Sequence, residues 1–304
     1  MSTPSAFPSS SSPSPPSAGM SSPSDYVAFW NDTLADKFNR YQHILMNGLS
    51  YHSRVALEEL ELSPGSRILD VGCGWGDTAI QLARMTGPEG EVLGIDCVDA
   101  FLEDARRRAE EAGVRNVRFE AADVEHYAFA AHFDLCFSRF GMMFFEHPVP
   151  AMRNVFQALK PGGELVFIVW RDIADNPWLG LPKEVVLDFL PPPGDNARSC
   201  GPGPFSMADP DTVRQQLEIA GFTDIGFGRN DGPVEVGDSV EEAVRFQLAL
   251  GPAGEVFREA GEEAERQRPD IEAALRKALT PFEQGGRIVM GSSSWTIVAR
   301  KSHG

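Results

Sequence analysis

Residues 66–77 read SRILDVGCGWGD, and this stretch decides the fold class. Its apolar run, 67–71, predicts a buried strand, and the glycines at 72, 74 and 76 predict a tight turn. Residues 78–83 continue with the pattern of a helix. A strand, a glycine-rich turn and a helix N-terminus in this order let backbone N–H groups come close to a polar ligand. We therefore expect a ligand site where the first strand ends.

Further along the chain, short apolar runs alternate with helical segments. Strands are predicted at 67–71, 91–95, 117–121, 133–138, 164–170, 222–227 and 294–300. Helices are predicted up to residue 85 and at 101–112, 149–159 and 211–220. This alternation predicts an α/β fold with a doubly wound, mostly parallel, seven-stranded sheet of the Rossmann-like kind and added lid helices.

The chain divides by composition into three parts. Residues 1–24 are nearly all Ser, Pro, Ala and Gly and predict a disordered tail. Residues 25–65 predict N-terminal lid helices, with a separate second helix over 54–60. The main domain is expected over 66–304. Its cap insertions are expected at 171–210, with irregular structure, and at 237–287, with two or three helices.

The net charge of the chain argues against several classes of partner, and the spacing of its cysteines argues against a metal site or a disulfide. A net charge of −17 argues against nucleic acid and anionic membranes, which would repel the chain. The sequence shows no membrane-spanning stretch and no basic leader segment. Its four cysteines, Cys73, Cys97, Cys136 and Cys200, have no metal or disulfide spacing. We expect a cytoplasmic monomer or homodimer that acts on a small molecule and holds no metal.

Acidic residues follow two further strands. Asp96 stands about twenty residues beyond the glycine turn, where a carboxylate can accept both hydroxyls of a ribose. Asp123 with Val124 can pair with the amine and a ring nitrogen of adenine. A dinucleotide fingerprint would need a third glycine where Asp77 stands. The pattern therefore favours S-adenosylmethionine (SAM) over NAD, and an NAD-dependent oxidoreductase is the disfavoured alternative.

At this point the chain resembles the class I SAM-dependent methyltransferases, in the small-molecule branch that includes the ubiquinone- and menaquinone-biosynthesis type. The matching pieces are 69–76, 94–96, 122–124, 133–135 and 159–163, in family order. The resemblance implies the strand order 3-2-1-4-5-7-6 with the last strand antiparallel. It also implies these cofactor-binding residues: Asp70, Gly72, Cys73, Gly74, Gly76, Asp96, Cys97, Phe101, Asp123, Val124 and Ser138.

Individual roles follow from the same resemblance. Asp70 would orient the loop and approach the methionine amine, Phe101 would lie against adenine, and Ser138 would line the methionine side. The run 73–76 also looks like the loop of cyclopropane fatty-acid synthases, but the negative charge disfavours a bilayer substrate.

The expected reaction moves a methyl group from SAM to a small, largely apolar acceptor and releases S-adenosylhomocysteine. A phenolic, quinone-like or natural-product acceptor and O-methylation are favoured. The alternatives are a C-methyltransferase or alkene-directed relative, or a SAM-binding protein that catalyses cyclisation or rearrangement, or only binds. His147 is the nominated general base, although a partly exposed histidine beside Pro148 is the more ordinary interpretation. The competing candidates are His43, His52, Tyr26, Tyr41 and Tyr51.

Overall fold

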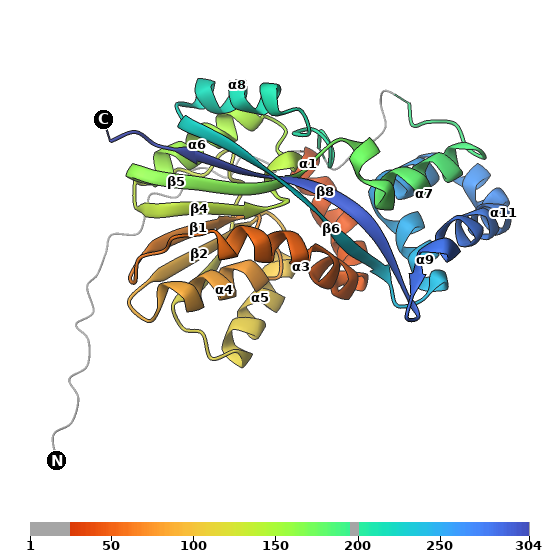
Figure 1. Ribbon diagram of the computed structural model, residues 1–304, viewed down its shortest axis with the longest axis horizontal. Helices are drawn as coiled ribbons and strands as arrows, with labels where there is room; N and C mark the ends of the chain where they lie inside the picture. Colours follow the sequence, from red (N-terminus) through yellow and green to blue (C-terminus); the bar gives the residue numbers. More distant parts are fainter. Residues whose placement is uncertain (1–24, 195–200, 304) are drawn as a thin grey trace, which may run out of the picture.

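The apolar runs form one sheet in the computed structural model, which describes residues 25–194 and 201–303. Its long strands are β1 (Arg67–Val71), β2 (Glu91–Asp96), β3 (Val117–Ala121), β4 (Phe133–Arg139), β5 (Leu159–Trp170), β6 (Thr223–Gly237) and β8 (Arg287–Arg300). They lie in the order β3-β2-β1-β4-β5-β8-β6, and the two-residue β7 (Glu283–Gln284) pairs with β8. Strand β8 is antiparallel to both of its long neighbours, whereas β1 to β5 run parallel (Figure 1). The predicted order and orientation are confirmed.

Helices flank this sheet, as the doubly wound pattern predicts. They are α3 (Gln42–Glu58), α4 (Asp77–Thr86), α5 (Asp99–Glu111), α6 (Pro148–Ala158) and α8 (Pro210–Ala220). Helices α4 and α5 lie against β1, β2 and β3, whereas α6 and α8 contact each other and lie against β4, β5 and β6. Short loops at the carboxyl ends of the parallel strands therefore face the same edge of the sheet.

The N-terminal segment departs from its prediction in one respect. It contains α1 (Asp25–Phe29), the π-helix η1 (Trp30–Leu34) and α2 (Ala35–Arg40) before α3. The expected separate helix over 54–60 does not exist, because α3 continues to Glu58. Its interior Gly48 lets it lie directly on β6: a Cβ there would stand 2.8 Å from the Glu235 carbonyl oxygen. The predicted disordered tail, 1–24, lies outside the described residues.

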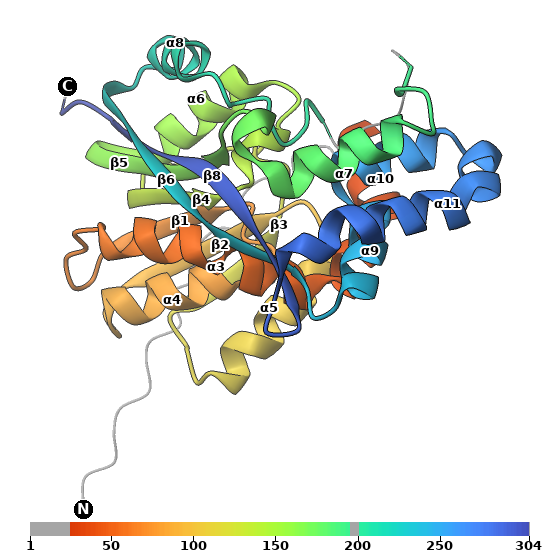
Figure 2. The same ribbon diagram turned by 45° about the vertical axis from the view of Figure 1, so that its right-hand side comes forward.

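A group of cap helices stands beyond the carboxyl edge of the sheet. It comprises η3 (Ile173–Asp175), α7 (Pro177–Leu187), α9 (Val240–Ala249), α10 (Gly251–Glu259), α11 (Glu262–Leu279) and η4 (Thr280–Phe282). Helices α7, α9, α10 and α11 pack together although α7 comes from a distant part of the chain (Figure 2). The prediction of irregular structure over 171–210 is wrong for Pro177–Leu187, which form α7. That helix begins with a proline at its first position and buries Trp178, Leu179 and Val186 against the cap.

Strands β6 and β8 are longer than the sequence predicts. They pair with each other from Thr223–Arg300 to Gly237–Ile288, but β5 pairs with β8 only as far as Ser294. The outer part of this hairpin therefore leaves the sheet and reaches the cap. Strand β5 also begins earlier than predicted, at Leu159, because that residue pairs with Phe133 before an irregularity in the register.

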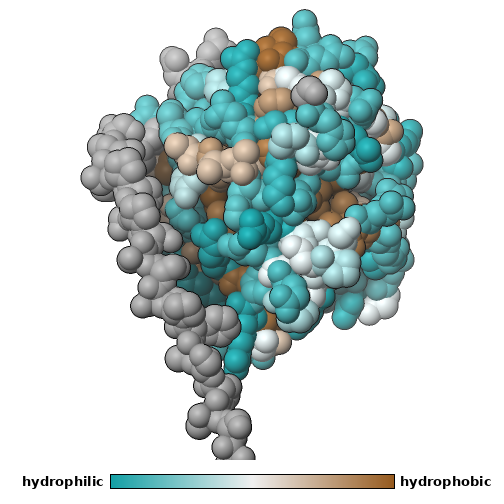
Figure 3. All heavy atoms as spheres, turned by 90° about the vertical axis from the view of Figure 1, so that its left-hand side faces the viewer, coloured by the Kyte–Doolittle hydropathy of each residue, from teal (hydrophilic) through white to brown (hydrophobic). Residues whose placement is uncertain are grey.

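The surface is mainly hydrophilic. Among the described residues, the exposed large apolar side chains are Met85 and Ile219. The face opposite the cap shows only small, separate hydrophobic patches (Figure 3). None of the helices in 25–194 and 201–303 is long and apolar enough to cross a membrane.

Candidate active site

A cavity of about 280 Å³ lies between the carboxyl edge of the sheet, the N-terminal segment and the cap. The strand-end residues that line it include Gly72, Cys73, Gly74, Trp75, Asp96, Cys97, Phe101, Asp123, Val124, Glu125 and Arg139. Eight of the eleven predicted cofactor-binding residues are among them. The cavity continues from these polar strand ends into an aromatic region, so one space is available to two different ligands.

Asp96 is held in a fixed orientation at the end of β2. Its carboxylate accepts hydrogen bonds from the Gly74 N–H at 2.8 Å and the Val98 N–H at 2.9 Å. Burial raises the pKa of this carboxyl, while the two backbone donors lower it. The bond to Gly74 also ties β2 to the glycine turn of β1. A pair of hydroxyl donors on a ribose would find the remaining acceptor positions of the carboxylate inside the cavity.

Asp123 is similarly fixed at the end of β3. One of its oxygens accepts the Glu125 N–H at 3.0 Å, and the other lies 2.8 Å from the Nδ1 atom of His126. The hydrogen bond to Asp123 raises the pKa of His126. Val124 follows with its side chain almost completely buried. Sequence reasoning identified both strand-end residues but missed His126, whose partner is visible only in the turn geometry.

The glycine turn and the loop after β4 touch without side chains between them. A Cβ on Gly72 would stand 3.1 Å from the Cα atom of Gly141, and one on Gly141 would stand 3.0 Å from the Val71 carbonyl oxygen. Between β4 and this contact, Phe140 has a φ angle of 57°, which is unusual for a residue with a side chain. Its ring stacks on Trp170 with centroids 4.0 Å apart. This stacking offsets the backbone strain and fixes one wall of the cavity.

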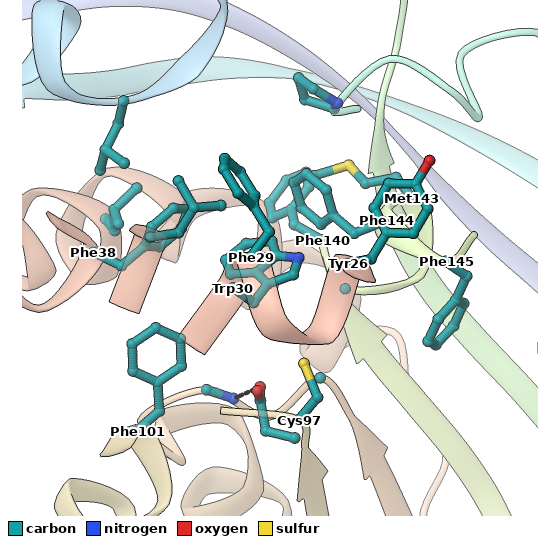
Figure 4. A pocket seen from close by; sticks show the side chains of 18 of the residues that line it. Tyr26, Phe29, Trp30, Phe38, Cys97, Phe101, Phe140, Met143, Phe144 and Phe145 are labelled. Carbon is teal, nitrogen blue, oxygen red and sulfur yellow. Dashed lines mark hydrogen bonds between the residues drawn. The ribbon is translucent and has the colours of Figure 1, made fainter. Parts of the chain in front are cut away.

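Aromatic rings from four parts of the chain form the far region of the cavity. They are Tyr26, Phe29, Trp30, Phe38, Phe140, Phe144, Phe145, Trp170, Trp178 and Phe246. Figure 4 shows Cys97 and Phe101 at the strand ends, and the rings of Phe29, Trp30 and Phe140 across from them. A planar apolar molecule fits such a surface, because stacking and burial then act together.

The N-terminal segment closes the cavity over the β2 end. A small apolar cluster of Ala35, Trp75, Val98 and Phe101 lies apart from the main core. The Trp75 indole N–H donates to the Asn39 side chain at 2.7 Å, and the Asn31 amide donates to the Cys97 carbonyl at 3.0 Å. Sequence reasoning missed both asparagines, since nothing in their local pattern indicates a partner 36 or 66 positions away.

Three predicted residues do not line the cavity but lie behind its wall. Asp70 is fully buried and accepts a hydrogen bond from the Thr78 hydroxyl at 2.7 Å, and its other oxygen has no hydrogen-bond partner within 25–194 and 201–303. Burial raises the pKa of Asp70 to about 7. Ser138 is also fully buried, and its hydroxyl has no hydrogen-bond partner in the described part of the chain. Gly76 begins α4 with a φ of 77°, and a Cβ there would stand 2.8 Å from the Phe119 ring.

The nominated base lies outside the cavity. The His147 side chain is 63% exposed, and the residue is fixed through its backbone N–H to Glu125. This position does not support the prediction that it removes a proton from an acceptor. His147 begins α6, where its neighbour Pro148 takes the first helical position.

The structure also shows where the competing candidates for the general base lie. Tyr26 lines the cavity. His43 is exposed and pairs with Glu242, and Tyr41 is buried against Phe246. His52 is buried between the hydroxyls of Ser292 and Ser294, and burial lowers its pKa to about 4.

Tyr51, the remaining candidate, lies at Gly232 and is absent from the cavity lining. One described group presents metal-ligand atoms close together, namely His43, Asp238 and Glu242, within 4.8 Å of one another. Glu242 accepts a hydrogen bond from the Asp238 N–H and pairs with His43. These contacts explain the group as part of the N-terminal capping of α9.

Carboxylates at the ends of β2 and β3, a glycine turn at β1 and an adjoining aromatic space define a class I SAM-dependent methyltransferase. Residues 62–182 match the family model described as "Methyltransferase domain". The ubiquinone/menaquinone biosynthesis C-methyltransferase UbiE of Ectopseudomonas mendocina is 30% identical over 66% of this chain and 83% of its own length. The chain belongs to the methyltransferase family that contains these UbiE enzymes, and its methyl donor is SAM.

Other comparisons agree with this assignment. UbiE of Azotobacter vinelandii is 30% identical over 66% of this chain and 84% of its own length. The YcgJ protein of Bacillus subtilis superposes with a TM-score of 0.53 at 19% identity, over 84% of this chain and 99% of that one. Phosphoethanolamine N-methyltransferase 2 of Haemonchus contortus, in complex with SAM, superposes with a TM-score of 0.55 at 17% identity, over 93% of this chain and 60% of that one. At these identities the two structures show the fold alone.

Proposed function

We propose that the protein transfers the methyl group of SAM to an oxygen of a small, largely apolar, planar acceptor bound in the aromatic region. The observation that carries the proposal is the continuity of the cavity, whose acidic strand ends pass directly into a wall of rings. In this arrangement Asp96 holds the ribose, and Asp123 and Val124 hold adenine. Phe101 lies beside the base, and the glycine turn carries the methionine part.

Methyl transfer from SAM depends more on how the two reactants are positioned than on a strong acid or base. Bound SAM supplies a methyl group on a positively charged sulfur. The acceptor oxygen bonds to that carbon as the carbon–sulfur bond breaks, and the hydroxyl proton leaves to a base or to water. The aromatic rings exclude water and orient the acceptor in line, which accounts for much of the rate. Tyr26 carries the hydroxyl among the rings labelled in Figure 4 and is our candidate to hydrogen-bond the acceptor oxygen.

Transfer to carbon is the second candidate, because both UbiE relatives are named as C-methyltransferases. The two outcomes differ in the bond that the new methyl carbon forms. Incubation with SAM labelled with ¹³C in the methyl group, and with a panel of phenols and hydroxyquinones, separates them by NMR of the product.

The expected result is an oxygen-bound label together with release of S-adenosylhomocysteine. A carbon-bound label would favour the second candidate. SAM binding without S-adenosylhomocysteine release across the panel would favour the binding or rearrangement alternatives and contradict the proposal.

A further inference from the structure

A carboxylate from the cap, that of Glu255, lines the cavity. Glu255 lies on α10 and is half-buried. Pro252, Gly254 and Arg258 of the same helix also line the cavity, so one face of α10 closes this side of it. Within 25–194 and 201–303, Glu255 makes no hydrogen bond or ion pair. Its carboxylate is therefore available to a ligand.

The neighbouring Arg258 shows which region of the cavity Glu255 faces. Residues three apart on a helix lie on the same face. The Cζ atom of Arg258 lies 5.1 Å from the centroid of the Phe29 ring, while its guanidinium pairs with Glu259 at 3.0 Å. Phe29 is one of the rings of the aromatic region. Glu255 therefore faces the region to which we assign the acceptor.

The other acidic residues of the described lining lie on the cofactor side. Asp96 and Asp123 are the strand-end carboxylates that backbone N–H groups hold in place. His126 binds Asp123, and this hydrogen bond raises the pKa of His126. The charges of Glu125 and Glu146 raise it further, so both carboxylates lie near the end of β3. Within the described lining, the acceptor side is thus left with the carboxylate from α10.

The remaining titratable side chains of the described lining are not suited to accept a proton. Burial raises the pKa of the Cys73 and Cys97 thiols, which therefore stay protonated. Arg139 is a cation that pairs with Asp77 at 2.6 Å. Tyr26 is already our candidate to hydrogen-bond the acceptor oxygen. No histidine or lysine is among the described residues that line the cavity.

We propose that Glu255 is the general base of the reaction and removes the proton from the acceptor hydroxyl. This inference rests on the proposed function, because it concerns transfer to oxygen. The hydroxyl oxygen bonds to the methyl carbon, and the carbon–sulfur bond breaks with its electron pair on sulfur. The O–H proton moves to the carboxylate of Glu255, which is half-buried and can return it to water. A base held in position contributes about a hundredfold or more to such a step.

The test measures methyl transfer by the full chain to two phenols of different acidity. In mildly alkaline buffer 4-nitrophenol is largely ionised and needs no base, whereas 1-naphthol keeps its proton. We expect Glu255→Gln to lower kcat for 1-naphthol about a hundredfold. Its kcat for 4-nitrophenol should not fall. Calorimetry should give the wild-type affinity for S-adenosylhomocysteine, because Glu255 lies away from the strand ends that hold the cofactor.

Glu259→Gln is the matched control. Glu259 lies one turn further along α10 and is absent from the cavity lining. The substitution removes the same charge from the same helix, so it separates proton transfer from a general effect of charge in the cap. Its turnover of both phenols should equal that of the wild type.

Each other result overturns a defined part of the argument. Equal kcat of wild type and Glu255→Gln for 1-naphthol refutes the inference and leaves the proposed function intact. An equal fall for both phenols refutes it too, because the side chain would then position the acceptor without accepting its proton. If the wild type releases no S-adenosylhomocysteine with either phenol, that result contradicts the proposed function itself.

Discussion

The buried carboxyl of Asp70 lowers the stability of the fold as the pH rises, whereas most acidic residues of a folded protein raise it. Burial raises the pKa of Asp70 to about 7 from a usual 3.8. As the pH rises above 3.8 the unfolded chain releases this proton, while the folded chain keeps it until about pH 7. The folded state therefore loses stability across that window, and the loss is complete above it.

Replacing Asp70 by Asn removes this titration and keeps the shape of the side chain. Linkage with these two pKa values gives a cost to the wild type of about 2 kcal/mol at pH 5 and about 4 kcal/mol at pH 8. The free energy of unfolding of Asp70→Asn should therefore gain about 2–3 kcal/mol relative to wild type between pH 5 and pH 8. Urea unfolding followed by circular dichroism at the two pH values measures it.

Asp134→Asn is the control for this experiment. Asp134 is half exposed, and its partner Lys160 helps to hold the pKa of this carboxyl below its usual value, so it is ionised in both states from pH 5 to pH 8. Its difference from wild type should not change with pH. A constant difference for Asp70→Asn as well would refute the reasoning, because Asp70 would then be ionised in the folded chain at pH 5.

The remaining predictions concern the site. Asp96→Ala should weaken SAM binding by about 1.5–3 kcal/mol in calorimetry, through loss of charge-assisted hydrogen bonds; unchanged affinity would place the ribose elsewhere. A Cβ at Gly74 meets nothing within 4 Å, whereas one at Gly76 overlaps the Phe119 ring. Both glycines have a positive φ, 52° and 77°, so any side chain there strains the backbone. Gly76→Ala adds the overlap with Phe119 and should lower the melting temperature more than Gly74→Ala, which should mainly reduce cofactor affinity; the reverse pattern would contradict the loop geometry. His147→Ala should keep full methyl-transfer activity, and a hundredfold loss would restore it as a base.

The sheet and the strand-end acids were predictable because each depends on a local pattern. Apolar runs of five to seven residues identify the parallel strands, and an acid directly after a run must lie at the carboxyl edge of the sheet. Asp96 and Asp123 follow from this rule alone. The same rule says nothing about whether a side chain points into the cavity or behind it. The family resemblance, and not this rule, implied that Asp70 and Ser138 contact the ligand.

The features that the sequence could not predict depend on distant partners. Arg139 meets Asp77 across 62 positions, and the paired asparagines of the N-terminal segment are set by tertiary packing. The helix α7 was missed because its prolines indicate loops, whereas Pro177 stands at the one helical turn where proline is favourable. The lengths of β6 and β8 were missed since their outer halves pair with each other and with the two-residue β7, beyond the rest of the sheet.

That long hairpin has a mechanical consequence for access to the cavity. Helices α9 to α11, followed by η4 and β7, connect β6 to β8, so tilting these helices would bend the ladder of backbone hydrogen bonds between the two strands. The register of this ladder shifts only near its two ends. The segment 25–40 is attached instead by side-chain contacts. They include the small apolar cluster, the edge contact of Trp30 with Phe144, the Arg258 guanidinium over the Phe29 ring, and the hydrogen bonds of the two asparagines. We therefore expect ligands to enter and leave beneath 25–40, with fast amide hydrogen exchange there and slow exchange along β6 and β8. Slow exchange in both would instead describe a site that opens only when the whole domain unfolds.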